Sequence, residues 1–269
     1  MKSVGSTKKI TSATKLIAAT KLRGCELRST AARNLPTPVV DLLGDAPAAP
    51  VSKTLVVPIT TDRGLCGGIN TIICKYAKGM IAMNEDKAEH DTKVFVVGDK
   101  GRSQLRRVYP EKIVGTTQDN GKFGGMTFNV ACTIAEEMLK NEADKTLIVY
   151  NRFFSAVKYV PTIATILSPA AAEAMAEEGG KLDAYEIEGP DRAELLMDLG
   201  EFQLALQLYQ AMLDNATSEQ ASKMQAMENA TNNAQEMLEK LTQLYNRTRQ
   251  AAITTELSEI IGGASALEG

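Results

Sequence analysis

The sequence predicts an α/β domain combined with a long antiparallel coiled coil that is built from the two ends of the chain. Three observations support this fold class. Residues 201–261 contain no glycine or proline, residues 6–35 form a second helix-like segment, and strand-like runs alternate with amphipathic runs between them. We therefore divide the chain into an N-terminal shaft helix with its connector (1–50), an α/β domain (51–189) and a C-terminal shaft helix (190–269).

The N-terminal segment is the first predicted helix. Pro36 and Pro38 end it, and residues 1–33 hold eight basic residues and one acid, whereas the rest of the chain holds 22 basic and 32 acidic residues. This charge suits packing beside a more acidic helix. A mitochondrial presequence is the alternative for such a basic, acid-poor segment. Apolar and small residues recur at steps of three or four, and we expect the helix contact at Ile10, Ala13, Ile17, Thr20 and Gly24.

The middle of the chain predicts a small, mostly parallel, doubly wound domain. Pro36–Pro50 is a broken connector before it, and Gly179-Gly180 and Gly189-Pro190 mark the exit after it. The strand-like runs are Thr54–Thr60, Thr92–Gly98, Lys112–Thr116, Lys145–Asn151 and Val157–Leu167. The helical runs are Ile69–Met83, Arg102–Val108 and Thr127–Asn141.

The C-terminal segment has the composition and spacing of a coiled-coil helix. Alanine, glutamine, glutamate, leucine and methionine dominate it, and these residues favour helices. A helix over residues 201–261 would be roughly 90 Å long, whereas a compact chain of this size has a diameter of about 50 Å. We therefore expect the helix to protrude and its apolar stripe to be covered. The stripe steps alternately by three and four residues, at Met227, Ala230, Ala234, Met237, Leu241, Leu244, Thr248 and Ala251.

Composition excludes several classes of protein. The chain has 269 residues, no tryptophan and 5% aromatic residues, so a stacking platform for nucleic-acid bases is not expected. Its four cysteines lack a CxxC pair and His90 is the one histidine, which leaves no zinc set and no catalytic triad. No run reaches the ~18 apolar residues of a membrane helix. We expect no metal, no cofactor, no nucleic acid and no membrane span.

A glycine-rich turn follows the first central strand and opens a helix, which is where a doubly wound fold binds phosphate. Residues 61–70 read TDRGLCGGIN, which matches neither the dinucleotide fingerprint nor the phosphate-loop pattern. Asp99 ends the second strand and could imitate a ribose-binding acid. The simpler interpretation is a tight turn that another backbone approaches closely.

Three asparagines of the C-terminal segment fit the glycosylation triplet, namely Asn215, Asn229 and Asn246. They lie on one predicted helix, and no secretion signal precedes them. We therefore interpret them as polar points that set the register of the shaft or face a partner.

Several segments resemble the gamma-subunit family of F-type ATP synthases. The most specific is residues 246–264, NRTRQAAITTELSEIIGGA. Residues 97–100 and 151–153 are closer to mitochondrial members of the family than to bacterial ones. Further matching segments are KIT at 9–11, Ala18-Ala19 with Lys21, DRGLCGG at 62–68, and TSEQA at 217–221 followed by Met224 and Met227.

The resemblance implies a Rossmann-like central domain and a coiled coil that turns inside a ring of alternating alpha and beta subunits. The implied function is that of the central-stalk rotor, which couples proton-driven rotation to ATP synthesis or hydrolysis and carries no catalysis itself. The implied partners are the alpha and beta subunits, the small epsilon- and delta-type stalk subunits and the membrane c-ring. The implied location is peripheral, on the matrix side of the mitochondrial inner membrane, with the cytoplasmic side of a bacterial plasma membrane as the alternative.

The family match also assigns residues that contact the beta subunits. Arg249 and Gln250 would contact one beta-subunit loop. Arg63 and Cys66 would approach the acidic lever segment of beta from below. Three basic residues would face that same segment from the N-terminal helix, namely Lys15, Lys21 and Arg23.

The end of the C-terminal helix would form a tip seated in an apolar bearing at the top of the ring. Small residues such as Gly262 and Gly263 would limit steric hindrance as this surface turns. By family match the tip consists of Ile260, Ile261, Ala264 and Leu267.

Two other classes of function stay open at the level of sequence. A nucleotide-dependent enzyme built on the central domain would bind ATP or NAD through Gly64–Gly68. A coiled-coil adaptor would form a homodimer along residues 201–261, and its basic head would bind nucleic acid or an anionic membrane surface. The rotor hypothesis predicts neither saturable nucleotide binding nor a homodimer.

Overall fold

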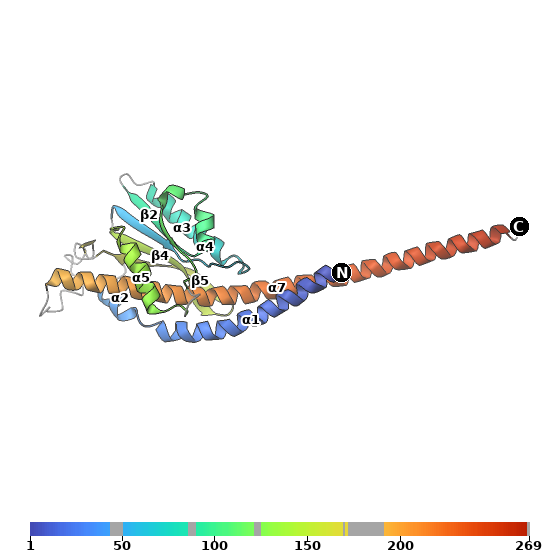
Figure 1. The fold of residues 1–269 in the computed structure, drawn as a ribbon, viewed down its shortest axis with the longest axis horizontal. Helices are drawn as coiled ribbons and strands as arrows, with labels where there is room; N and C mark the ends of the chain where they lie inside the picture. Colours follow the sequence, from blue (N-terminus) through green and yellow to red (C-terminus); the bar gives the residue numbers. More distant parts are fainter. Residues whose placement is uncertain (44–50, 86–89, 121–124, 169, 172–190, 268–269) are drawn as a thin grey trace. The chain divides into compact units, whose positions relative to one another are not determined.

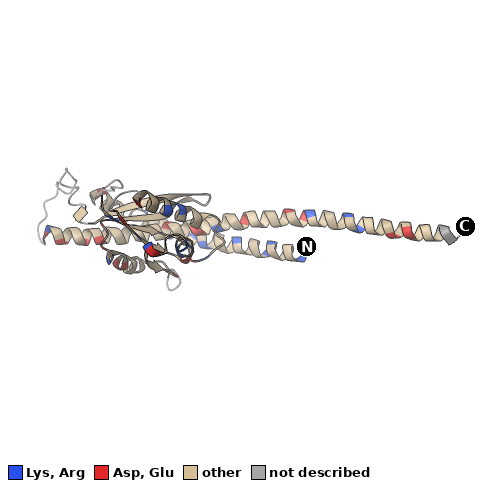
Figure 2. Cartoon of the chain, turned by 90° about the horizontal axis from the view of Figure 1, so that it is seen from above, with Lys and Arg blue, Asp and Glu red and all other residues tan. Residues whose placement is uncertain are grey.

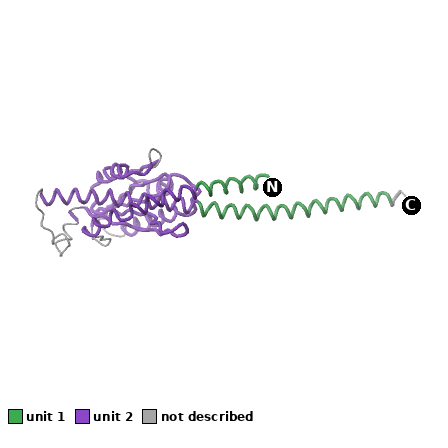
Figure 3. The backbone as a smooth tube through the Cα atoms, turned by 90° about the horizontal axis from the view of Figure 1, so that it is seen from below, with its two compact units in different colours: residues 1–17, 224–269 green, residues 18–223 purple. Residues whose placement is uncertain are grey.

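The structure is a computed structural model that describes residues 1–43, 51–85, 90–120, 125–168, 170–171 and 191–267. Its contacts form two compact units (Figure 3). Unit 1 comprises residues 1–17 and 224–269, and unit 2 comprises residues 18–223. The two longest helices, α1 (Lys2–Ala32) and α7 (Arg192–Leu267), each contribute to both units.

A five-stranded sheet forms the centre of unit 2, with the strand order β3-β2-β1-β4-β5 (Figure 1). All neighbouring strands are parallel except β4 and β5. Only two residues separate β4 from β5, which suffices for a hairpin but not for a parallel crossover. The prediction of a mostly parallel sheet is confirmed, with β1 at Lys53–Pro58, β2 at Asp91–Val97, β3 at Ile113–Thr117, β4 at Lys145–Ser155 and β5 at Lys158–Leu167.

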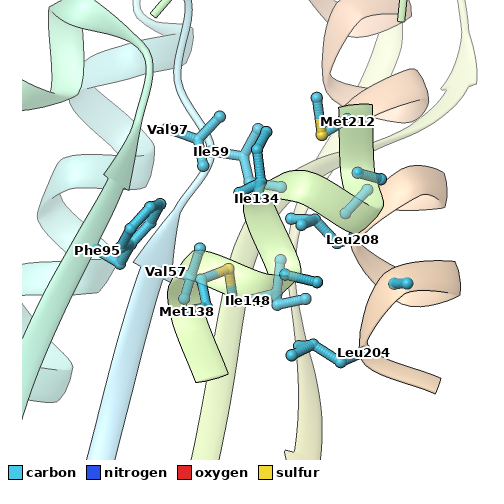
Figure 4. Close-up of a cluster of buried hydrophobic side chains, with 14 of the residues drawn as sticks. Val57, Ile59, Phe95, Val97, Ile134, Met138, Ile148, Leu204, Leu208 and Met212 are labelled. Carbon is cyan, nitrogen blue, oxygen red and sulfur yellow. The ribbon is translucent and has the colours of Figure 1, made fainter. Parts of the chain in front are cut away.

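Helices cover both faces of this sheet, as a doubly wound fold requires. On one face, α3 (Ile69–Glu85) and α4 (Asp99–Leu105) bury the strand residues that point toward them. On the other face, α5 (Phe128–Leu139) and the unit 2 part of α7 form a larger apolar core (Figure 4). Because both faces are covered, the inner strands are apolar without alternation, and Val56 and Val57 are both fully buried.

The larger core joins three elements of unit 2. Leu204, Leu208 and Met212 of α7 lie against Ile134 and Met138 of α5 and against the sheet residues Val57, Ile59 and Ile148 (Figure 4). A helix with this much apolar burial is held mainly by packing rather than by its own propensity. The unit 2 part of α7 is therefore a component of the domain core.

Two short helices were not predicted. The segment expected to be a broken connector begins with α2, Thr37–Leu43, because proline is tolerated in the first turn of a helix. A 3₁₀ turn, Pro110–Lys112, precedes β3. The rest of the connector and the glycine pairs expected at the exit from the domain, Gly179-Gly180 and Gly189-Pro190, lie outside the described residues.

The long C-terminal helix is confirmed. It runs from Arg192 to Leu267, so it extends beyond the glycine- and proline-free run 201–261 and includes Gly200, Gly262 and Gly263. One glycine costs a helix only about 1 kcal/mol relative to alanine, so long helices tolerate it. Along the described helices, none is long and apolar enough to cross a membrane.

The predicted contact face of α1 is wrong in phase. Ile10 and Ile17 are 66% and 58% exposed, and Ala13, Thr20 and Gly24 are exposed as well. The buried face consists of small or polar residues with one leucine: Thr11, Ala18, Leu22, Ser29 and Ala32. Small side chains let two helices approach closely, whereas the other large apolar residues of α1, namely Ile10, Leu16, Ile17 and Leu27, remain exposed.

Unit 1 is an antiparallel helix pair, as predicted. Three contacts join α1 to α7: Lys8 Nζ donates to Gln235 Oε1 (2.6 Å), Thr231 Oγ1 to Thr11 Oγ1 (2.7 Å) and Lys15 Nζ to Glu228 Oε1 (2.7 Å). Residue numbers fall along α1 as they rise along α7, which defines the antiparallel direction.

The predicted seam of α7 is only partly buried. Met227 and Ala234 are buried, whereas Met237 and Leu244 are 53% and 59% exposed. α1 begins at Lys2, and among the described residues of unit 1 no other helix lies beside the last turns of α7. From residue 242 to residue 264 every described side chain of α7 is exposed.

Candidate partner-contact surfaces

The glycine-rich turn presents one apolar side chain to solvent. Leu65 has a φ of 63°, an uncommon conformation for a residue with a Cβ, and its side chain is 71% exposed. Arg63 beside it is exposed too. Leu65 was not among the predicted contact residues. A leucine in an otherwise polar, glycine-rich turn was the sequence feature that could have indicated it.

Cys66 lies behind this turn rather than on its surface. Its side chain is 2% exposed, and Asn70 Nδ2 donates to its Sγ at 3.3 Å. The same Asn70 amide group accepts from the Thr61 N–H (2.9 Å) and donates to Thr61 Oγ1 (2.8 Å). Asn70 thus ties both ends of the turn together, and Cys66 contributes to the inner support of the exposed Arg63 and Leu65.

The edge of the sheet where a nucleotide would bind carries a carboxylate. Asp62 accepts from the backbone N–H of Asp99 (3.1 Å) and from that of Asp119 (2.9 Å). Asp99 itself pairs with Arg102 (3.1 Å). Dinucleotide-binding folds hold phosphate at the turn after the first strand. Here that turn carries the Asp62 carboxylate, which is bonded to the backbone after β2 and after β3.

The basic residues assigned to the beta contact divide between the two units. Lys15 belongs to unit 1, where it pairs with Glu228 at 2.7 Å. Lys21 and Arg23 belong to unit 2 and are exposed. Charged residues of both signs are spread along the unit 1 part of α7 (Figure 2).

The residues assigned to the C-terminal contacts are all on one helical segment of unit 1. Arg249 and Gln250 are exposed, as are Ile260 (70%), Ile261 (57%) and Ala264. Leu267 is the last residue of α7, and its side chain lies outside the described part. The sequence analysis missed Ile253 and Leu257, which are 54% and 58% exposed and continue the apolar stripe toward Ile260 at steps of four and three.

Two buried ionisable groups have shifted pKa values. Burial raises the pKa of the Cys74 thiol to about 11, so this thiol stays protonated and is not a nucleophile at neutral pH. Burial also raises the pKa of the Asp214 carboxyl above its ordinary value, while the hydrogen bond from Ser29 opposes that shift. Among the described residues, no group of histidine, cysteine, aspartate and glutamate side chains is arranged to hold a metal ion.

Comparison with known proteins relates the whole chain to one family. A family model described as ATP synthase matches residues 1–267. The chain is 45% identical to the mitochondrial ATP synthase subunit gamma of Ipomoea batatas, over all of this chain and 83% of that protein. It is 40% identical to the ATP synthase gamma chain of Pelagibacter ubique, over 98% of this chain and 96% of that protein.

Solved structures show the same fold. A chain in the central stalk and c-ring of the Tetrahymena thermophila mitochondrial ATP synthase superposes with a TM-score of 0.69 at 27% identity, over 82% of this chain and 99% of that chain. A chain of the Euglena gracilis mitochondrial ATP synthase gives a TM-score of 0.84 at 24% identity, over 99% and 91%. At 24% identity, the likeness to the Euglena chain concerns the fold alone.

Proposed function

The chain belongs to the ATP synthase gamma-subunit family, and from this premise we propose that it is a rotor subunit without an active site of its own. Its role is that of the central stalk. In this proposal rotation of the subunit presents different side chains in turn to each beta subunit. Each orientation stabilises one beta conformation more than the others, and this difference in contact free energy couples rotation to nucleotide affinity.

The observation that carries the proposal is the fully exposed end of α7. All described side chains from residue 242 to residue 264 are exposed, including Leu244, Ile253, Leu257 and Ile260, each at least 54%. An apolar stripe of this length on a lone helix requires a partner. A ring of other subunits around the helix would supply it.

The edge of the sheet supports the absence of catalysis. Asp62 accepts from the backbone N–H groups of Asp99 and Asp119, so the negative charge that this site accommodates is already part of the chain. A nucleotide phosphate there would face a carboxylate. We therefore favour the rotor over a nucleotide-dependent enzyme.

We assign the contacts as follows. Arg249 and Gln250 contact a beta-subunit loop, and the tip formed by Ile260, Ile261, Ala264 and Leu267 rotates in an apolar bearing. The acidic lever segment of beta faces the exposed Lys21, Arg23 and Arg63. Lys15, which also pairs with Glu228, contacts the same segment. Cys66 acts from behind, by supporting the turn that carries Arg63.

The proposed partners are the alpha and beta subunits, the small stalk subunits and the membrane c-ring. Mitochondrial ATP synthase subunits are among the relatives, and the Tetrahymena chain belongs to a central stalk with a c-ring. These support a peripheral position on the matrix side of the mitochondrial inner membrane. Bacterial gamma chains are also relatives, so the cytoplasmic side of a bacterial plasma membrane is the alternative.

Reconstitution tests the proposal. The full chain is mixed with alpha and beta subunits and ATP turnover is measured, alongside ATP titration of the chain alone. We expect a stable complex that hydrolyses ATP, and no saturable binding by the isolated chain. The matched control is a chain that ends at Thr242, which keeps the paired part of α7 and lacks the exposed part. Equal turnover with both chains, or saturable ATP binding by the isolated chain, would contradict the proposal.

A further inference from the structure

The unit 2 part of α7 buries a row of polar side chains. Asp214 is 1% exposed, Asn215 4%, Ser218 0% and Ser222 4%, and we call these four residues the polar row. Asp214 and Asn215 are adjacent, and Ser218 and Ser222 follow at steps of three and four, so the four residues share one side of the helix. Burying polar groups costs free energy unless they are hydrogen-bonded, so the partners of the row reveal its role.

Each member of the row bonds to a part of unit 2 that is distant in sequence. Asp214 Oδ1 accepts from Ser29 Oγ of α1 at 2.5 Å. Asn215 Oδ1 accepts from Asn151 Nδ2 of β4 at 3.0 Å, and Ser218 Oγ donates to the backbone oxygen of the same Asn151 at 3.1 Å. One helix face is thereby bonded to both α1 and the central sheet.

Ser222 ends the row and bonds to two more elements. Its Oγ donates to the backbone oxygen of Cys66 at 2.6 Å, and it accepts from the hydroxyl of Tyr159 on β5 at 3.2 Å. The first bond connects α7 to the turn that exposes Arg63 and Leu65. Ser222 is also the last residue but one of unit 2, which ends at residue 223.

These hydrogen bonds fix the rotation of α7 about its own axis more strictly than its apolar contacts do. Hydrogen bonds need specific distances and angles, whereas packing of small residues such as Ala211 and Ala221 is less directional. Shifting α7 by one residue would turn its side chains by about 100° and break all the bonds of the row together. Buried polar residues are known to specify register in helix packing.

We propose that Asn215, Ser218 and Ser222 are positioning residues that fix the rotation of α7 against the sheet and the glycine-rich turn, and so carry torque between them. This inference rests on the proposed rotor function. In a rotor the load is a twist about the helix axis, and directional bonds on one side of the helix resist twist. The apolar core provides stability, and the polar row provides angular stiffness.

The test compares two variants of the complete, membrane-reconstituted complex. Ser218→Ala with Ser222→Ala removes the three bonds that these hydroxyls make with Asn151 and Tyr159 of the sheet and with Cys66 of the turn. The matched control is Thr217→Val on the same helix, because Thr217 is equally buried and its hydroxyl bonds only to Leu213 of its own helix. The readouts are unloaded ATP turnover, protons pumped per ATP, and angular fluctuation of a probe on unit 2 in single molecules.

We expect the double variant to keep its unloaded ATP turnover, to pump fewer protons per ATP and to show an angular spread about twofold wider, because each lost bond is individually weak. The control keeps all three values. Equal spread and equal pumping in every variant would overturn the inference, and so would an equal loss in the control. If the double variant does not assemble, the single variants Ser218→Ala and Ser222→Ala are measured instead by the same criteria. Failure of the unmodified chain to rotate would refute the proposed function itself, a distinct result.

Discussion

Two segments of the same helix differ completely in what surrounds them. Between residues 203 and 222, α7 is buried on its apolar and much of its polar surface, and the polar row is bonded to α1, the sheet and the glycine-rich turn. Between residues 242 and 264, every described side chain is exposed. The first segment completes its contacts within the chain, whereas the second presents apolar residues that no described part of the chain covers. The contrast separates residues that hold the fold from residues that we propose contact partners.

The largest expected effect comes from a leucine on each segment. Leu208→Ala removes a fully buried side chain from the main core and should destabilise the chain by about 2–5 kcal/mol. Leu257 is 58% exposed, so Leu257→Ala should leave the free energy of unfolding of the isolated chain nearly unchanged. Urea unfolding of both variants measures the difference. Similar losses would show that the exposed segment is folded against the chain itself, and the contrast would be false.

The second-largest expected effect is a loss of ATP turnover without a loss of stability. Arg249→Ala combined with Gln250→Ala should lower ATP turnover by the assembled complex on the order of tenfold, equivalent to about 1.4 kcal/mol of barrier, because polar contacts with beta would be lost. Both side chains are exposed, so the unfolding midpoint of the isolated chain should not move. Unchanged turnover in a fully assembled complex would remove these two residues from the contact surface.

A third test uses the buried carboxyl of the polar row. Burial raises the pKa of the Asp214 carboxyl above its ordinary value, so the folded chain holds this proton to higher pH than the unfolded chain does. Stability therefore falls as pH rises from the unfolded pKa to the folded pKa and is constant above it. In Asp214→Asn this loss is absent, and the Asn oxygen still accepts from Ser29.

The pH dependence is read from urea unfolding of both chains at several values above pH ~4. We expect the variant to gain stability relative to the unmodified chain as pH rises, and then to keep a constant difference. The charges that face Asp214 are Arg33 after α1 and Arg152 on β4, and both oppose the shift. A difference that is flat over the whole range would mean that these arginines cancel the effect of burial.

The core of unit 2 was predictable, and its reason is physical. Strands buried on both faces are apolar runs such as Val56–Val57 that need no partner information to be recognised. The phase of α1 was not predictable in the same way. Ile10 and Ile17 are apolar and recur at helical spacing, yet Ala18 and Ser29 make the contact. A hydrophobic pattern shows which residues require burial but not whether the chain itself or another protein buries them.

The candidate surfaces show the same limit. Asn215 was predicted either to set the register of the shaft or to face a partner, and its bond to Asn151 supports the first of these roles. Asn229 and Asn246 are exposed, so the asparagines of the three triplets do not share one structural role. Leu65 was missed because its exposure and its positive φ are properties of the folded turn, in which the next residue, Cys66, is bonded to Asn70 and Ser222.

The smallest expected effect is that of the ion pair in unit 1, which lies in the part of α7 that is paired with α1. Lys15 and Glu228 lie 2.7 Å apart with side chains 36% and 48% exposed, so solvent screens the pair, and such pairs contribute about 0.2–1 kcal/mol. A double-mutant cycle with Lys15→Ala and Glu228→Ala on the isolated chain should give a coupling energy in that range, decreasing with added salt.

The same cycle measured by ATP turnover in the complex separates two roles of Lys15. If Lys15 only pairs within the chain, Glu228→Ala alone reproduces the loss caused by Lys15→Ala. A larger loss for Lys15→Ala would show that the lysine also contacts beta, as proposed.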